Sequence, residues 1–178
     1  MRLGLPAQIE AVRQLTGRVV GTKFVNAFRF EPLDVPAERD TFLIAQENGH
    51  IVVRGNSGPA LASGLNCYLK EHAKAHFSWN ASQPGNLERL PSLSAPVRRE
   101  SWARWRYFLN YCCYSYSLAF WRWEEWEPLI DWMALQGVNL PLAITGQEAV
   151  WRAVGQRMGL SKSDLDGFLP GPAYLPFG

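Results

Sequence analysis

The sequence lacks any long apolar stretch. No segment approaches the roughly 20 apolar residues of a membrane-spanning helix, so we expect no membrane span. Met1 is followed by a short polar and amphipathic run that lacks the apolar core of a signal peptide. Either the protein is not secreted, or its true N-terminus is missing. The sequence itself leaves the compartment open.

Cysteine is scarce, and its three copies are Cys67, Cys112 and Cys113. An odd number argues against a disulfide framework. Residues 112 and 113 fall in a predicted strand, where neighbours point to opposite faces, so they should not bridge each other. The three histidines have no cysteine spaced to join them in a zinc site. The sequence therefore predicts no metal and no other cofactor.

Excess charge and phosphate-binding glycine motifs are also missing. The net charge of +2 is too small to indicate a nucleic-acid partner or an anionic membrane. Neither GxGxxG nor a P-loop occurs, so nucleotide binding has no support. With 47% hydrophobic and 19% charged residues, the 178-residue chain has the balance of one medium or two small folded domains.

Tryptophan is plentiful but unevenly placed, because seven of the eight follow Ser101. This shift predicts two regions with different roles. We expect a small α/β domain at residues 1–80, a proline-containing linker at residues 81–100, and a second α/β region at residues 101–178.

The first region is predicted to contain one sheet and two helices. Asn48-Gly49 indicates a tight hairpin, since both turn positions tolerate positive φ. Gly17 is expected to end the first helix, and Ser57-Gly58-Pro59 to begin the second. The expected elements are helix 6–16, strand 19–30, strands 41–45 and 51–54, helix 58–74 and strand 77–79.

The second region alternates strand and helix, which is the repeat of a βαβ fold. The expected elements are strand 105–116, helix 128–136, strand 138–144 and helix 145–159. We expect Trp126, Leu129, Ile130 and Met133 to share the buried face of the first of these helices. Pro141 would forfeit a hydrogen bond of the second strand.

Polar side chains gather at the end of the first of these strands. Asn110, Cys112, Ser115 and Tyr116 follow an aromatic run, and functional residues of parallel barrels lie at the carboxyl ends of strands. Amide and phenol groups suit the hydroxyls of a sugar, and aromatic rings suit its apolar faces. The alternative is an aromatic core strand with a few satisfied polar groups.

Glu148 follows the second strand and invites a catalytic interpretation. The competing interpretation is a capping box, in which Thr145 caps the helix and Glu148 reaches back to it. We favour the cap. Glu124, Glu125, Glu127 and Asp131 also suit a helix N-terminus, and nothing in the sequence pairs them for acid–base work.

One series of segments runs through residues 106–178: Arg106-Tyr107, Asn110, Cys112, Ser115-Tyr116-Ser117, Trp126-Glu127, 130–140, 145–151 and 171–175. In order and spacing, these segments resemble family 89 glycoside hydrolases, the α-N-acetylglucosaminidases. Residues 1–80 resemble the family more loosely, through Val53-Arg54-Gly55, Gly64-Leu65 and Tyr68-Leu69.

This resemblance implies a (β/α)₈ TIM barrel, of which only the first two strand–helix units are present. It implies a retaining exo-glycosidase that removes terminal α-linked N-acetyl-D-glucosamine from a glycan, which in animal relatives is heparan sulfate in lysosomes. A lysosomal, vacuolar or extracellular location follows by the same resemblance. No catalytic residue is expected in this chain, because both catalytic glutamates of the family lie on later barrel strands.

The resemblance also implies four substrate-binding residues. Asn110, Cys112 and Tyr116 match the pocket for the terminal sugar. Phe177 aligns with a family aromatic that is usually tryptophan, and phenylalanine lacks the indole N–H donor. Two hypotheses stay open: a fragment of the hydrolase, or a shortened, non-catalytic carbohydrate-binding or interaction protein.

Overall fold

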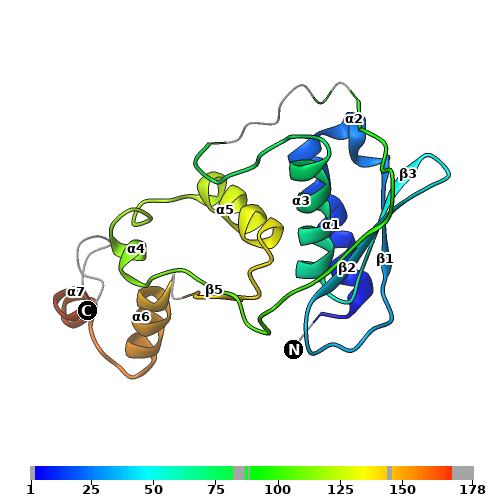
Figure 1. The fold of residues 1–178 in the computed structure, drawn as a ribbon. Coiled ribbons are helices and arrows are strands. Elements are labelled where there is room, and N and C mark those ends of the chain that lie inside the picture. Colours follow the sequence, from blue (N-terminus) through cyan, green and yellow to red (C-terminus); the bar gives the residue numbers. More distant parts are fainter. Residues whose placement is uncertain (1–2, 82–86, 88, 144–145, 170–178) are drawn as a thin grey trace. The chain divides into compact units, whose positions relative to one another are not determined.

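The computed structural model describes the chain except for residues 1–2, 82–86, 88, 144–145 and 170–178 (Figure 1). The chain divides into two compact units. The first joins Met1–Arg106 to Glu127–Leu140, and the second joins Tyr107–Trp126 to Pro141–Gly178. The fold is α/β, as the sequence predicts, while the domain boundaries at residues 80 and 100 stay a prediction.

A four-stranded sheet in the order β1-β3-β2-β4 organises the first unit. Strand β1 runs parallel to β3, and the other neighbours are antiparallel. Helices α1 and α3 pack against the sheet (Figure 1), α1 on β1 and α3 on β2 and β3. The elements before residue 101 are α1 Leu5–Val20, α2 Thr22–Val25, β1 Phe28–Pro32, β2 Thr41–Glu47, β3 His50–Gly55, α3 Gly58–Glu71 and β4 Val97–Glu100.

The predicted hairpin is confirmed between β2 and β3. Asn48 and Gly49 both have positive φ, 48° and 79°, which is the conformation that a two-residue turn of this kind requires. Glu47 and His50 are therefore directly opposite each other in the ladder. The turn chemistry fixes the register, and the register places Ile44 and Val53 together in the core.

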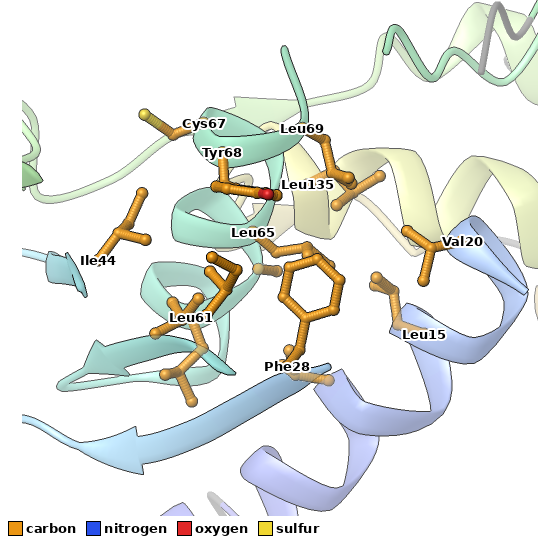
Figure 2. Close-up of a cluster of buried hydrophobic side chains, with 14 of the residues drawn as sticks. Leu15, Val20, Phe28, Ile44, Leu61, Leu65, Cys67, Tyr68, Leu69 and Leu135 are labelled. Atoms are coloured by element: carbon orange, nitrogen blue, oxygen red, sulfur yellow. The ribbon is translucent and has the colours of Figure 1, made fainter. Parts of the chain in front are cut away.

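Helix α3 begins as the sequence predicts and holds the centre of the core. The Ser57 hydroxyl accepts a hydrogen bond from the Ala60 N–H at 3.1 Å, which caps the helix. The buried face of α3 carries Leu61, Leu65 and Tyr68 (Figure 2). The Phe28 ring meets the Tyr68 ring edge-on at 5.6 Å. Each buried side chain of this size contributes roughly 1.5–3 kcal/mol.

Three predictions for the first unit are wrong. Helix α1 continues through Gly17 to Val20 and ends at Gly21, whose φ is 76°. Burial of Val20 extends the apolar stripe, which offsets the roughly 1 kcal/mol cost of a glycine inside a helix. The strand expected at 19–30 is therefore β1 alone, from residue 28. The structure describes residues 77–79 but forms no strand there, although Phe77 is buried.

The last four residues of the segment predicted as a linker form β4, which pairs with β2 from Thr41 opposite Glu100 to Ile44 opposite Val97. Earlier in the same segment, the Pro91 carbonyl accepts a hydrogen bond from the Tyr68 hydroxyl at 2.6 Å. These contacts tie the segment to the first unit, which proline content alone does not reveal.

The alternation of strand and helix continues after residue 106, but the strands are short. Backbone bonds run from Leu140 N–H to Arg106 O at 3.2 Å and from Leu142 N–H to Phe108 O at 2.8 Å. Both partners advance by two residues in the same direction, which is the pattern of parallel strands. The elements are β5 Tyr107–Phe108, α4 Cys112–Ser115, α5 Trp123–Leu135, β6 Leu140–Pro141, α6 Gln147–Arg157 and α7 Lys162–Phe168.

Helix α5 begins five residues before the predicted Pro128 and includes that proline. Its buried residues are Leu129, Asp131 and Leu135, whereas Ile130 is 43% exposed. The predicted apolar face is therefore only partly right. Asp131 joins this buried face through a partly buried ion pair with Arg18, with two bonds of 2.7 Å.

Candidate functional site

A loop at the carboxyl end of β5 holds three of the four predicted sugar-binding residues. The Asn110 side-chain oxygen accepts a hydrogen bond from the Cys112 N–H at 2.7 Å, and the Asn110 carbonyl accepts one from the Cys113 N–H at 3.2 Å. These bonds turn the chain into the short helix α4. The strand predicted to run to Tyr116 therefore ends at Phe108.

Asparagine explains this early end of the strand. Its short amide competes for nearby backbone N–H groups and so favours turns and helix starts over extended chain. The prediction that Cys112 and Cys113 point to opposite faces of a strand fails for the same reason, since both lie in α4.

The loop brings Asn110 and Cys112 together at one end of α4 and places Tyr116 directly after the other end. Cys112 is half-buried, and the Tyr116 side chain is 52% exposed. Phe177 lies outside the described residues. The assignment of these four residues to sugar binding stays a prediction.

Aromatic side chains fix the other side of the same loop. The Tyr114 ring stacks on Trp126 at 5.8 Å, and Trp121 meets Trp126 edge-on at 5.4 Å. The Tyr114 hydroxyl donates to the Leu142 carbonyl, just after β6. Burial raises the pKa of Tyr114, with smaller contributions from Tyr107 and Cys113. The segments after β5 and β6 are thus joined, a role for Tyr114 that the sequence analysis missed.

All three cysteines are free in the structure. Cys67 is buried, and burial raises the pKa of its thiol, whereas Cys112 and Cys113 are half-buried. We expect titration of the unfolded protein to find three thiols, with or without reductant. In the folded protein Cys67 should react last, because it combines low exposure with a raised pKa. Finding one thiol without reductant would contradict this prediction.

Several carboxylates after residue 120 make hydrogen bonds or ion pairs that stabilise the fold. The Glu125 carboxylate accepts from the Arg122 N–H at 2.7 Å. Asp131 binds the Arg18 guanidinium, and Glu127 lies 3.7 Å from it. The local sequence gives Glu127 and Asp131 no partner, because Arg18 is more than 100 residues away in the chain. None of these arrangements places a free carboxylic acid beside a carboxylate nucleophile.

The pKa shifts point the same way for the acids of α7. The Ser161 hydroxyl and backbone hold the pKa of Asp164 below its usual value. Lys162, and after it Arg152, lower the pKa of Asp166. A glycosidase acid needs a raised pKa so that it can donate a proton. These carboxylates stay ionised and do not fit that role.

The predicted capping box at α6 stays a prediction, because Thr145 lies outside the described residues. The N-cap of α6 in the structure is Gly146, with a φ of 88° and no side-chain cap. Glu148 is exposed in the first turn, where an acid still suits the helix dipole. A capping box does occur at α7, between Ser161 and Asp164. Its serine and aspartate spacing was present in the sequence and was overlooked.

Arg106, which directly precedes β5 in the chain, is held by several bonds within the first unit. Its guanidinium bonds to Asp40, to the Gly137 carbonyl at 2.5 Å and to the Ala103 carbonyl at 2.8 Å. The Arg106 N–H donates to the Asn139 side-chain oxygen at 2.9 Å. Because Asn139 directly precedes β6, this cluster holds the beginnings of both short strands in register.

No group of three or more histidine, cysteine, aspartate or glutamate side chains is placed to hold a metal ion in the part of the chain that the structure describes. Among the same residues, no helix combines the length and apolar character that crossing a bilayer demands.

Comparison with known proteins gives matches along most of the chain. Two domain models of one family match: the α-N-acetylglucosaminidase N-terminal domain over residues 10–92 and its tim-barrel domain over residues 106–178. The Homo sapiens α-N-acetylglucosaminidase is 37% identical over 172 residues, which are 94% of this chain and 23% of the human protein.

Solved structures of a family 89 glycoside hydrolase from Clostridium perfringens are similar in fold. The complex with PUGNAc gives a TM-score of 0.89 at 36% identity, covering 97% of this chain and 20% of that one. The same values hold for a form with two glutamates replaced by glutamine, bound to its substrate GlcNAc-α-1,4-galactose. The present chain thus spans less than a quarter of these relatives.

Proposed function

Because this chain belongs to the α-N-acetylglucosaminidase family, we propose that it is the N-terminal part of a retaining exo-glycosidase. Its reaction is hydrolysis of terminal α-linked N-acetyl-D-glucosamine from a glycan, of the heparan-sulfate type if it follows animal members. The observation that carries this proposal is the loop from Asn110 to Tyr116, which follows a short parallel strand as barrel active-site loops do.

The proposal assigns β5 with α5 and β6 with α6 to the first two units of a (β/α)₈ barrel. Their order and the parallel bonds between β5 and β6 support it. The backbone N–H groups of Leu140 and Leu142 donate hydrogen bonds towards β5. The backbone nitrogen of Pro141, between them, therefore points to the opposite side, where a third strand would pair. The proline therefore costs no bond to β5. In this arrangement the N-terminal domain spans residues 1–80 and the barrel begins near residue 101.

The chemistry of the loop suits a sugar. The Asn110 side-chain oxygen is bound within the turn, and its NH₂ group makes no hydrogen bond to the described residues, which leaves a donor for a sugar hydroxyl or acetamide oxygen. The Tyr116 phenol offers a hydroxyl and an aromatic face. Cys112, whose backbone N–H binds the Asn110 side chain, adds a half-buried thiol to the same loop. Phe177 would add ring stacking without the donor of tryptophan.

The catalytic carboxyl groups belong outside this chain in our proposal. Retaining hydrolysis needs two carboxyl groups about 5–5.5 Å apart, one a nucleophile and one an acid with a raised pKa. The four described carboxyl groups with a resolved pKa shift, Glu47, Glu71, Asp164 and Asp166, all shift downwards. A barrel also takes about 250 residues, far more than follow residue 100 here.

We therefore expect the 178-residue chain to show no hydrolysis of an aryl α-N-acetylglucosaminide above a matched blank. A longer protein that includes the remaining barrel strands should hydrolyse the same substrate with retention of configuration. An NMR time course that identifies the anomer released first measures this stereochemistry. Turnover by the short chain, abolished by replacing one of its own carboxylates, would contradict the proposal.

The purified 178-residue chain also distinguishes the hydrolase from the second hypothesis, a shortened carbohydrate-binding or interaction protein. A verified transcript that stops after residue 178, together with sugar binding by the short chain without turnover, would favour a non-catalytic carbohydrate-binding protein. Continued open reading into further barrel strands would favour the hydrolase.

A further inference from the structure

A cavity of about 410 Å³ lies at the β1 edge of the first unit. Its walls come from α1, the C-cap of α2, β1 and the first residue of β3. Since β1 is the outer strand of the sheet, this side carries no further strand among the described residues. Every lining residue precedes residue 55, so the cavity belongs to the N-terminal sheet and its first helix.

Two arginines in this cavity lack a carboxylate. Arg13 on α1 and Arg29 on β1 both line it, and neither makes a hydrogen bond or ion pair with the residues that the structure describes. Arg29 acts on Glu47 only as the smallest of the influences that lower the pKa of that acid. The cavity therefore has two positive groups without a close negative partner.

Two other arginines of the first unit differ from Arg13 and Arg29 because they form ion pairs with carboxylates. The one acid in the cavity, Glu31, is held by Arg54 at 2.8 Å. A second cavity, of about 450 Å³, contains Arg18, but there Asp131 and Glu127 neutralise the guanidinium. Uncompensated positive charge is thus a property of the cavity between α1 and β1, not of arginine-lined hollows in general.

The remaining walls determine what kind of anion fits. The Asn26 amide adds a neutral donor, and Ile9 and Phe30 form an apolar side. Guanidinium groups bind sulfate and phosphate oxygens through paired, charge-assisted hydrogen bonds. The volume lies within the range of sites for small organic ligands.

We propose that this cavity binds a small ring-bearing molecule with a sulfate or phosphate ester, the oxyanion lying between Arg13 and Arg29. The ring rests against the apolar side formed by Ile9 and Phe30. None of its lining residues belongs to the loop from Asn110 to Tyr116, and the proposal does not depend on glycosidase activity.

Calorimetric titration of the chain with glucose 6-sulfate, glucose 6-phosphate and glucose tests the proposal. At least one ester should bind about tenfold or more tightly than glucose, since only the esters place charge between the arginines. The preferred ester identifies the oxyanion. Equal binding of glucose and both esters would overturn the proposal, and so would the absence of ester binding.

Two matched variants localise the binding. Arg13→Gln and Arg29→Gln should each weaken ester binding about tenfold, while Arg98→Gln on β4, at the opposite edge of the sheet, should leave it unchanged. All three side chains are exposed, so unfolding temperatures should stay near that of the parent. If a glutamine variant unfolds, Arg29→Lys keeps the charge but loses the paired geometry, and intermediate affinity is expected. Unchanged affinity in the folded Arg13 and Arg29 variants would sink the assignment.

Discussion

Replacing Arg106 by alanine is expected to lower the free energy of unfolding by about 2–4 kcal/mol, somewhat below the roughly 3–5 kcal/mol for removing one partner of a fully buried ion pair, because this pair is partly buried. The Arg106 side chain is 19% exposed and that of its partner Asp40 is 14% exposed. Alanine would leave the Asp40 carboxylate without its cation and the Gly137 and Ala103 carbonyls without their donors. Leaving buried acceptors unsatisfied carries the full desolvation penalty.

Urea denaturation followed by circular dichroism measures this change, and Arg104→Ala is the matched control. Arg104 is exposed and lies over the Trp105 ring at 5.1 Å, an interaction of about 0.5–1 kcal/mol. A loss for Arg106→Ala no larger than that for Arg104→Ala would show that the Arg106 cluster is not a main support. Asp40→Ala should lower the free energy of unfolding by a similar amount, since it removes the other partner of the same ion pair.

Local signals in the sequence predicted the elements that depend on local chemistry. The Asn48-Gly49 turn and the Ser57 cap each act within four residues, and both occur as expected. The parallel order of β5 and β6 also agrees with the predicted alternation. Elements whose bounds depend on distant partners were predicted less well. Helix α1 outlasts Gly17 because Val20 enters a core that strands and α3 complete.

Long-range polar contacts explain most of the remaining differences. The pairs Arg18 with Asp131 and Arg106 with Asp40 join residues 113 and 66 positions apart. Hydrophobic periodicity carries no information about such pairs, so sequence patterns assign Asp131 no partner and only a place near a helix N-terminus. The strand at 105–116 failed for a local reason instead, the turn chemistry of Asn110.

The candidate site depended more on family resemblance than on pattern. From the residues alone, Asn110, Cys112 and Tyr116 fitted either a pocket or a core strand. The structure places them on a loop at the end of β5, and Tyr116 is exposed, which a core strand would not give. Tyr114 supports the loop from its buried side, but its hydroxyl partner at Leu142 lies in the next strand–helix unit and was invisible to sequence reasoning.

Glu148 is predicted not to be a catalytic residue. It is exposed in the first turn of α6, whose N-cap is Gly146. Glutamine removes only a charge near the helix dipole, an effect of about 0.3–1 kcal/mol on stability. In a catalytically complete enzyme that carries these residues, Glu148→Gln should therefore keep most of its activity.

In the same complete enzyme, Tyr116→Ala is expected to lower kcat/KM by tens-fold or more, about 2 kcal/mol or above. The loss arises because alanine removes both the phenol hydroxyl and the ring that we assign to the terminal sugar. Tyr111→Ala is the matched control, since Tyr111 is also exposed, lies in the same loop directly before α4, and has no assigned contact with the sugar. Steady-state hydrolysis of an aryl α-N-acetylglucosaminide measures all three variants. If Tyr116→Ala stayed active while Glu148→Gln were dead, the sugar site would lie after β6 and not in the loop after β5.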